Sequence, residues 1–301
     1  MTKKSNKTDE YYAKLTEMIL DQLRSGATTG KLWTELGNGS GLPANAVTGK
    51  RYNGSNVMWL LVAASEQGYS SNRWATYKQW AGIEGQVRKG EKGTLGVYWN
   101  FIEKEDEETG KKTRRAFMRT FSLFNLDQVD GDFGDRFDTA GPELDESLGK
   151  METVNAWFDS LGADIRTGGD RAFYNPGLDF VQMPAAKQFV NDEGFYGVLA
   201  HECGHWTGHE SRLDRKLNEG RFGSAAYAME ELVAEFTSAF VCAHLGIEAQ
   251  PREDHAGYIA SWIKVLENDE RAAYTAAAAA AKATGLLIDL AEGSADVEVA
   301  A

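Results

Sequence analysis

The sequence predicts an α+β fold in two domains: a front domain of helices with a β-hairpin, and a mostly helical back domain with a small antiparallel sheet. The chain has 301 residues, which is long enough for two hydrophobic cores. Its charge is divided unevenly, because residues 1–120 hold 19 Lys and Arg against 13 Asp and Glu, whereas the remainder holds 13 against 32. A polar, acidic and glycine-containing stretch separates the halves. The predicted segments are a front domain at 1–130, an acidic linker at 131–149, a back domain at 150–292 and a disordered tail at 293–301.

The composition excludes several classes of protein. Apolar residues make up 42% of the chain, and eight of its residues are tryptophan, which indicates a globular protein. No run of apolar residues is long enough to span a bilayer, so we expect no membrane partner. The basic residues 1–7 lead into a polar amphipathic stretch rather than the apolar core of a signal peptide. Cys203 and Cys242 form no C-x-x-C pair, so we expect a protein of the reducing cytoplasm.

Hydrophobic periodicity predicts the elements of the front domain. Residues 9–25 carry an apolar stripe at helical spacing, and 53–68 predict a buried helix. Apolar and β-branched residues predict strands at 94–102 and 113–124, which the charged loop 103–112 joins as a hairpin.

The back domain is predicted to begin with a short helix at 154–158. Two short strands follow at 171–174 and 178–183, and the second is a candidate edge strand for pairing with an extended substrate. Two longer helices then carry the candidate site. An alanine-rich helix at 268–284 closes the domain, because alanine propagates helix and allows close packing.

An H-E-x-x-H pattern lies in the back domain, with His201, Glu202 and His205 at its fixed positions. On a helix the two histidines lie one turn apart, so both imidazoles project from one face and can bind one metal ion. Glu202 is rotated by about 100° and can act as general base towards a water at that ion. The preceding residues predict a helix start with Asn191 or Asp192 as N-cap. The pattern therefore predicts two metal ligands and a catalytic Glu202.

A third ligand is needed to complete such a site. Six residues after the second histidine of the pattern the chain carries Ser211, so no third histidine stands there. His209 follows His205 by one helical turn, and three ligands along one helix would lie in a line and could not surround one ion. The third ligand is therefore expected on another helix.

That second helix is predicted between Ser224, its N-cap, and Gly246, its C-terminal stop. It carries Glu230, Glu231 and Glu235 within an apolar run, where an acid is costly to bury unless it is paired or binds a cation. Glu231 and Glu235 share a face at i, i+4, which suits one direct ligand and one carboxylate that holds a histidine N–H. We expect Glu231 on the metal and Glu235 behind it. The alternatives are the reverse assignment, or an exposed acidic stripe beside a chance H-E-x-x-H.

Two histidines and one glutamate form a ligand set of catalytic zinc, which makes the chain a candidate zinc-dependent metallopeptidase of the gluzincin type. We therefore expect Zn²⁺ as the cofactor, although these ligands do not exclude another divalent ion such as Mn²⁺. Tyr174, Tyr227, His209 and His255 are candidates to assist the chemistry, each with an ordinary structural role as the alternative.

Cations and aromatic residues alternate through the front half. Cations bind phosphates by counterion release and flat side chains stack on unpaired bases, so this composition suits single-stranded nucleic acid. The alternative is ordinary, because most aromatic residues are core residues and most Lys and Arg are solvated. Aromatic residues interleaved with the cations include Tyr69, Tyr77, Trp80, Tyr98, Trp99 and Phe117. The candidate DNA-binding residues are Lys50, Arg51, Tyr52, Arg73, Trp74, Lys78, Arg88, Lys89, Lys92, Arg114 and Arg115.

Short motifs follow one another along nearly the whole chain. In the front half they include Leu42-Pro43-x-Asn45, Thr48-Gly49-Lys50-x-Tyr52-x-Gly54-x-Asn56, Trp74-x-Thr76-x-x-Gln79 and Val87-Arg88-Lys89-Gly90-Glu91-Lys92-Gly93-Thr94. In the back half they include Ala172-Phe173-Tyr174, Gln182-Met183-Pro184, the H-E-x-x-H run with Trp206-Thr207-Gly208-His209, and Glu230-Glu231-Leu232-Val233-Ala234-Glu235. With these motifs in this order, the chain resembles the antirestriction ArdC family, plasmid proteins related to the N-terminal part of TraC-type primases. It departs from that family in carrying only Trp33 where two tryptophans often precede the Leu-Pro-x-Asn motif.

The resemblance implies a front domain that binds single-stranded DNA and a back domain with a zincin-like metallopeptidase fold. It also implies protection of incoming plasmid DNA from host restriction during conjugation. A host protein substrate or restriction component is a further expected partner. Two alternatives stay open: a DNA-associated metallopeptidase that cleaves a protein, and a pure single-strand-binding protein with a non-catalytic metal site. A retained Glu202 favours catalysis, because a structural metal site needs no general base.

Overall fold

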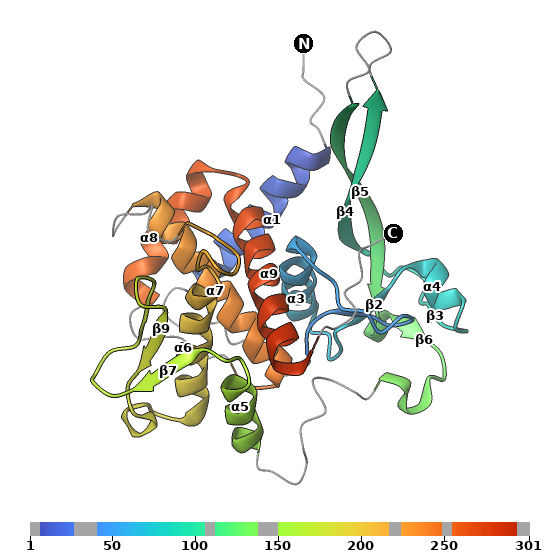
Figure 1. Cartoon of the computed structure of the whole chain (residues 1–301). Helices are drawn as coiled ribbons and strands as arrows, with labels where there is room; N and C mark the ends of the chain where they lie inside the picture. The colour runs from blue at the N-terminus through green and yellow to red at the C-terminus, as the bar shows by residue number, and fades with distance from the viewer. Residues whose placement is uncertain are drawn as a thin grey trace.

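The front domain combines two helices, α1 and α3, with a long twisted hairpin, as the computed structural model shows (Figure 1). The structure describes residues 7–26, 41–105, 112–137, 150–216, 224–248 and 255–293. The elements of the front half are α1 (Lys7–Gly26), β1 (Ala44–Asn45), α3 (Ser55–Gln67), β2 (Arg73–Ala75), α4 (Tyr77–Ala81), β3 (Gln86–Val87), β4 (Thr94–Glu105), β5 (Lys112–Asn125) and β6 (Val129–Asp130).

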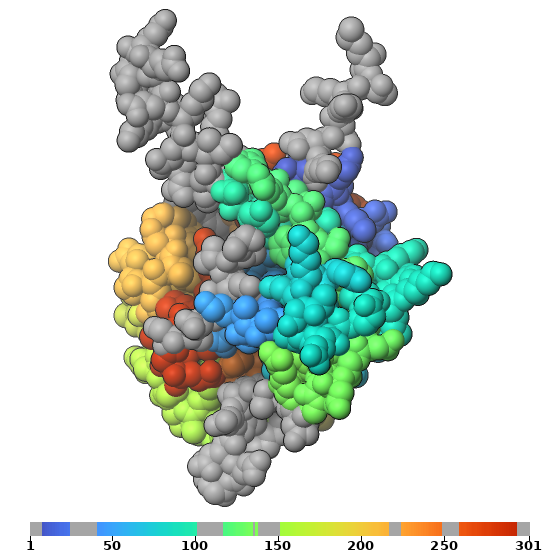
Figure 2. Space-filling model, turned by 90° about the vertical axis from the view of Figure 1, so that its right-hand side faces the viewer, coloured from blue at the N-terminus to red at the C-terminus, as the bar shows by residue number. Residues whose placement is uncertain are grey.

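The hairpin of β4 and β5 confirms the two strands predicted in the front half. Antiparallel pairing runs from Thr94 opposite Leu123 to Glu105 opposite Lys112. Strand β5 continues beyond the hairpin to pair with β2, and β2 pairs in parallel with β1. Figure 2 shows the side of the molecule on which β4, β5 and α4 lie. The strands extend into the predicted loop, to Glu105 on one side and from Lys112 on the other, and residues 106–111 lie outside the described part of the structure.

A small separate core holds the base of the front domain together. The ring of Trp80 lies 5.6 Å from that of Phe133 and 5.8 Å from that of Phe137. Both phenylalanines belong to the segment predicted as an acidic linker, so its first residues pack on the front domain instead of running free. The rest of that segment, from 138 to 149, lies outside the described residues, and the domain boundaries stay a prediction.

The back domain is mostly helical, with one small sheet. The alanine-rich helix is longer than predicted, and the sequence analysis missed α8 and β7. Strand β7 offers little apolar alternation, because most of its side chains are exposed. The elements are α5 (Lys150–Asp159), β7 (Asp164–Thr167), β8 (Phe173–Asn175), β9 (Phe180–Met183), α6 (Asp192–Trp206), α7 (Ala225–Leu245), α8 (His255–Asn268) and α9 (Ala272–Glu292).

The sheet of the back domain corrects the prediction of an edge strand at 178–183. Strand β9, which this segment forms, lies in the middle of the sheet, parallel to β7 on one side and antiparallel to β8 on the other. Its backbone groups are therefore taken on both sides. The pair of β8 and β9 is antiparallel as predicted, whereas β7 makes the sheet mixed. Strand β8 is the edge strand that contacts α6.

The two domains share one hydrophobic core. Helices α1 and α3 of the front domain both pack against α9 of the back domain. Tyr12 stacks edge-on against Tyr274 at 4.9 Å, and the indole N–H of Trp99 donates to the hydroxyl of Tyr274 at 2.6 Å. A fragment of either domain would expose this surface, so tests of function belong on the whole chain. Within the described residues, no helix is both long and apolar enough to cross a membrane.

Candidate metal centre

Helix α6 presents the H-E-x-x-H residues from a well-defined start. The side chain of Asn191 accepts a hydrogen bond from the backbone N–H of Gly194 at 2.8 Å, so Asn191 is the N-cap, one of the two predicted. The helix then runs through the motif and ends at Trp206. His201 and Glu202 are buried, and His205 is largely so. Their burial follows from the packing of α6 on α7.

Helix α7 supplies the acidic residues and lies very close to α6. Ser224 caps its start and Gly246 ends it in the left-handed conformation with φ 65°, both as predicted. Gly204, inside the H-E-x-x-H run, allows the close approach. A Cβ at position 204 would lie 3.2 Å from the Cα of Ala234 and 3.3 Å from the Cβ of Thr237. A side chain there would require the neighbouring atoms of α7 to shift by a few tenths of an ångström.

The structure brings His201, His205 and Glu231 together. The two Nε2 atoms lie 3.1 Å apart, and the carboxylate oxygens of Glu231 lie 3.6 Å from Nε2 of His201 and 3.5 Å from Nε2 of His205. Two ligands bound at about 2.1 Å in tetrahedral geometry lie about 3.4 Å apart. These three groups therefore have the separation of ligands around one ion.

A carboxylate lies behind each histidine. Oε1 of Glu235 is 3.0 Å from Nδ1 of His201, and Oε1 of Glu230 is 3.2 Å from Nδ1 of His205. The Nδ1 atom of His205 is hydrogen-bonded to Glu230, and the Nε2 atoms of the two imidazoles face each other. A cation between them satisfies that arrangement. The sequence analysis assigned no role to Glu230.

Hydrogen bonds dominate the acidity of two of these carboxylates. Burial would raise the pKa of Glu231, but the neighbouring imidazoles of His201 and His205 and the hydroxyl of Tyr227 lower it to about 2. Burial likewise opposes ionisation of Glu230, and its contacts with His205 and Arg215 lower the pKa below the ordinary value. Both groups are therefore carboxylates at neutral pH, as metal ligands and their supports must be.

The charge of the cluster suits a divalent cation. One guanidinium, that of Arg215, lies 2.7 Å from Glu230. Buried carboxylates are costly unless a cation balances them, so the donor set and its charge both fit a metal ion. Four carboxylates lie on α6 and α7 at this point and are largely buried: Glu202, Glu230, Glu231 and Glu235.

A second polar cluster joins the sheet to the end of α6. The guanidinium of Arg212 lies 3.9 Å from the ring centroid of Trp206, and its Nη1 donates to Asp179 at 3.0 Å. The hydroxyl of Tyr174 donates to Asp179 at 2.8 Å, and burial followed by this hydrogen bond raises the tyrosine pKa. Nδ1 of His209 is 4.0 Å from the same carboxylate. Tyr174 is therefore held in a structural network, as is Arg212.

Among the residues predicted to assist the chemistry, Tyr227 contacts a candidate metal ligand, because it is hydrogen-bonded to Glu231. Its position near the start of α7 places it beside the metal cluster. The side chain of His255 lies outside the described part of the structure.

Two predicted DNA-binding aromatics are core residues, and the prediction for them is wrong. Tyr52 is 5% exposed and Trp74 is 0% exposed. The Tyr52 hydroxyl donates to the backbone carbonyl of Trp74 at 3.2 Å. Stacking on a base requires an exposed ring face, which neither residue offers. Tyr77, at the start of α4, is 50% exposed and is the better candidate.

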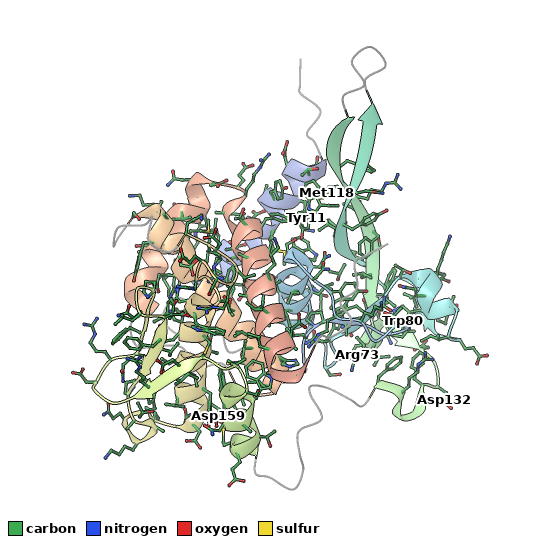
Figure 3. All side chains as sticks on the ribbon, viewed as in Figure 1. Tyr11, Arg73, Trp80, Met118, Asp132 and Asp159 are labelled. Atoms are coloured by element: carbon green, nitrogen blue, oxygen red, sulfur yellow. The ribbon has the colours of Figure 1, made fainter. Side chains whose placement is uncertain are left out.

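The predicted DNA-binding cations differ in their surroundings. Arg88 is engaged by acids, at 3.0 Å from Glu91 and 3.6 Å from Asp130. Arg73 is half-buried, which lowers the pKa of its guanidinium, and Figure 3 shows it in the front domain away from α6 and α7. The side chains of Arg114 and Arg115 lie outside the described part. Lys50 and Arg51 are partly buried, whereas Lys78, Lys89 and Lys92 are exposed.

The fold and the cluster together define a two-domain α+β protein whose back domain is zincin-like. The family model for zincin-like metallopeptidases matches residues 152–279, and that for the N-terminal domain of anti-restriction factor ArdC matches 9–124. The crystal structure of the metal-free antirestriction ArdC protein from the R388 plasmid has 36% identity and a TM-score of 0.76, over 95% of this chain and 99% of that one. Its Mn(II)-bound structure has a TM-score of 0.74, over 93% and 98%. The chain belongs to the antirestriction ArdC family.

The chain is also similar in sequence to two other proteins. Protein y4eC of Sinorhizobium fredii is 41% identical over 279 residues, which cover 90% of this chain and 89% of the relative. DNA primase TraC of Escherichia coli is 39% identical over 296 residues, which cover 90% of this chain but 26% of the primase. This chain therefore spans about a quarter of that primase.

Proposed function

We propose that this protein protects incoming plasmid DNA from host restriction during conjugation, that its front domain binds single-stranded DNA, and that its back domain carries a zinc metallopeptidase-type centre. The observation that carries the metal centre is the convergence of His201, His205 and Glu231 with Nε2–Nε2 and Nε2–carboxylate separations of 3.1–3.6 Å. Membership of the ArdC family supports the antirestriction role.

The residues would hold one divalent ion through two imidazole nitrogens and one carboxylate. This set suits Zn²⁺, and the Mn(II)-bound structure of the R388 relative supports Mn²⁺ as an alternative occupant. A cation there supplies Lewis-acid chemistry to a bound carbonyl group.

Glu202 is the residue that would move protons. It follows a ligand directly in the chain and is 4% exposed, on the helix that presents both histidines. A buried carboxylate at this place can accept a proton from an attacking water and return it to the leaving amine. Tyr227 is held against the ligand Glu231 and can orient it. An extended peptide would pair along β8, the edge strand that contacts α6 and carries the exposed Phe173.

A test of the catalytic role is Glu202→Gln, which keeps the size of the side chain but removes the base. We expect protection of DNA in conjugation to be lost while metal content and DNA affinity stay at wild-type values. Glu267→Gln, at an exposed position on α8, is the matched control. Protection at the wild-type level in Glu202→Gln would reject catalysis and leave a DNA-binding protein with a non-catalytic metal site. If Glu202→Gln loses both protection and the ability to cleave a DNA-bound protein that the wild type cleaves, that protein is the metallopeptidase substrate.

A test of the DNA role is charge reversal of Lys78 and Lys89, two exposed cations of the front domain. In the full-length protein we expect weaker binding to single-stranded DNA, with the salt dependence of log K reduced by about 0.7 for each lost phosphate contact. Lys187→Glu, exposed in the back domain, is the control. Absence of binding by the wild-type protein at low salt would reject the front-domain assignment.

A further inference from the structure

Arg215 reaches the metal cluster from the loop that follows α6. Its Nη2 and Nε donate to the two oxygens of Glu230 at 2.7 and 3.0 Å. Glu230 in turn lies 3.2 Å from Nδ1 of His205. The chain of contacts therefore runs from a loop arginine, through a carboxylate of α7, to a candidate ligand of α6.

The same guanidinium also fixes the end of α6. Nη2 donates to the backbone carbonyl of Gly204 and Nη1 to the hydroxyl of Thr207, both at 2.7 Å. Its side chain is 12% exposed. Four hydrogen bonds from one planar guanidinium hold α6, α7 and the loop in one relative position, which a lysine could not reproduce.

The backbone around Arg215 is strained. Its two neighbours, Asp214 and Lys216, have φ 48° and 57°, in the left-handed region that non-glycine residues seldom adopt. Such strain costs free energy and persists only where the surroundings determine it, typically at functional sites. These two backbone conformations flank Arg215, whose side chain points towards Glu230.

We propose that Arg215 is a positioning residue for the metal ligand His205 and acts through Glu230. The proposal rests on the proposed metal centre. By fixing Glu230, Arg215 sets the tautomer and the ring orientation of His205, so that Nε2 faces Glu231 and Nε2 of His201. Arg215 thereby raises the affinity of the site for metal.

The experiment measures the dissociation constants of Zn²⁺ and Mn²⁺ in full-length protein by competition with a chelator, and requires no enzymatic activity. We expect Arg215→Met and Glu230→Gln each to weaken metal binding by about 10- to 100-fold. Arg24→Met is the control, because its ion pair with Glu267, at 2.7 Å, lies on the exposed surface. We expect it to leave the dissociation constants unchanged.

The double variant Arg215→Met with Glu230→Gln separates positioning from a general structural role. If Arg215 acts through Glu230, the double variant binds metal as weakly as Glu230→Gln alone, and the effects do not add. Additive losses, or a fall in the stability of the metal-free protein with unchanged dissociation constants, would overturn the proposal. If the wild-type protein binds neither metal, the metal centre itself is rejected. If the wild type binds metal and Arg215→Met binds it equally well, only the role of Arg215 is rejected.

Discussion

The metal cluster and the DNA-facing surface differ in how much the sequence says about them. In the back domain, the residue types, their spacing on two helices and the acids within an apolar run all pointed to one small volume, and the structure brings them together there. In the front domain the same kind of reasoning selected Tyr52 and Trp74, which are core residues. A polar residue within an apolar run must find hydrogen-bond or ionic partners when it is buried, so few positions suit it. An aromatic residue suits both a hydrophobic core and a binding surface, so its role is harder to predict.

The largest effect is expected from Trp74→Ala, which tests whether this aromatic residue is core or contact. The side chain is completely buried, so we expect a loss of about 3–5 kcal/mol in the free energy of unfolding. Denaturant unfolding of the whole chain measures it. A loss below about 1 kcal/mol together with weaker DNA binding would restore Trp74 to the DNA-binding surface.

Gly204→Ala probes the closeness of α6 and α7. The added Cβ would meet Ala234 at 3.2 Å, so the facing backbone must shift by a few tenths of an ångström. We expect a cost of about 1–3 kcal/mol and weaker metal binding. Gly285→Ala in α9 is the matched control, because its Cβ would meet nothing within 4 Å and alanine favours helix. Thermal unfolding and metal titration of both variants provide the comparison. Equal behaviour of the two would show that the close packing at Gly204 is unimportant.

Tyr77→Ala tests the exposed aromatic that replaces Trp74 as the stacking candidate. We expect an affinity loss for single-stranded DNA equivalent to about 1–3 kcal/mol, because a base would lose its stacking partner. The stability should change little, since half of the side chain is exposed. Fluorescence anisotropy with a labelled oligonucleotide measures the affinity. Unchanged affinity would remove Tyr77 from the interface.

The smallest effect concerns pH and Asp179. Hydrogen bonding from Arg212, above all, lowers the pKa of Asp179 below its ordinary value. The contribution of Asp179 to stability is therefore complete above the unfolded-state pKa of about 3.9 and is lost as the pH falls through the lower folded-state pKa. Asp179→Asn should be less stable than wild type at pH 7, by an amount that shrinks on acidification below pH 4. A difference that grows on acidification would contradict this.

Most of the fold follows from local signals in the sequence. Ser224 and Gly246 bounded α7, and apolar and β-branched residues marked the hairpin, because caps and strand patterns act over a few residues. Strand β7 left no such pattern. The role of Glu230 was missed for another reason. It depends on a contact with Arg215, and no sequence pattern predicts that these two residues meet.

The central claim is tested most directly by metal binding to the purified full-length protein. We expect wild-type protein to bind about one divalent ion per chain, as measured by titration with Zn²⁺ and with Mn²⁺. Glu231→Gln removes the charged ligand and should abolish that binding while the protein stays folded. Wild-type protein without bound metal, or Glu231→Gln protein that binds as tightly as wild type, would contradict the assignment of His201, His205 and Glu231 as the metal centre.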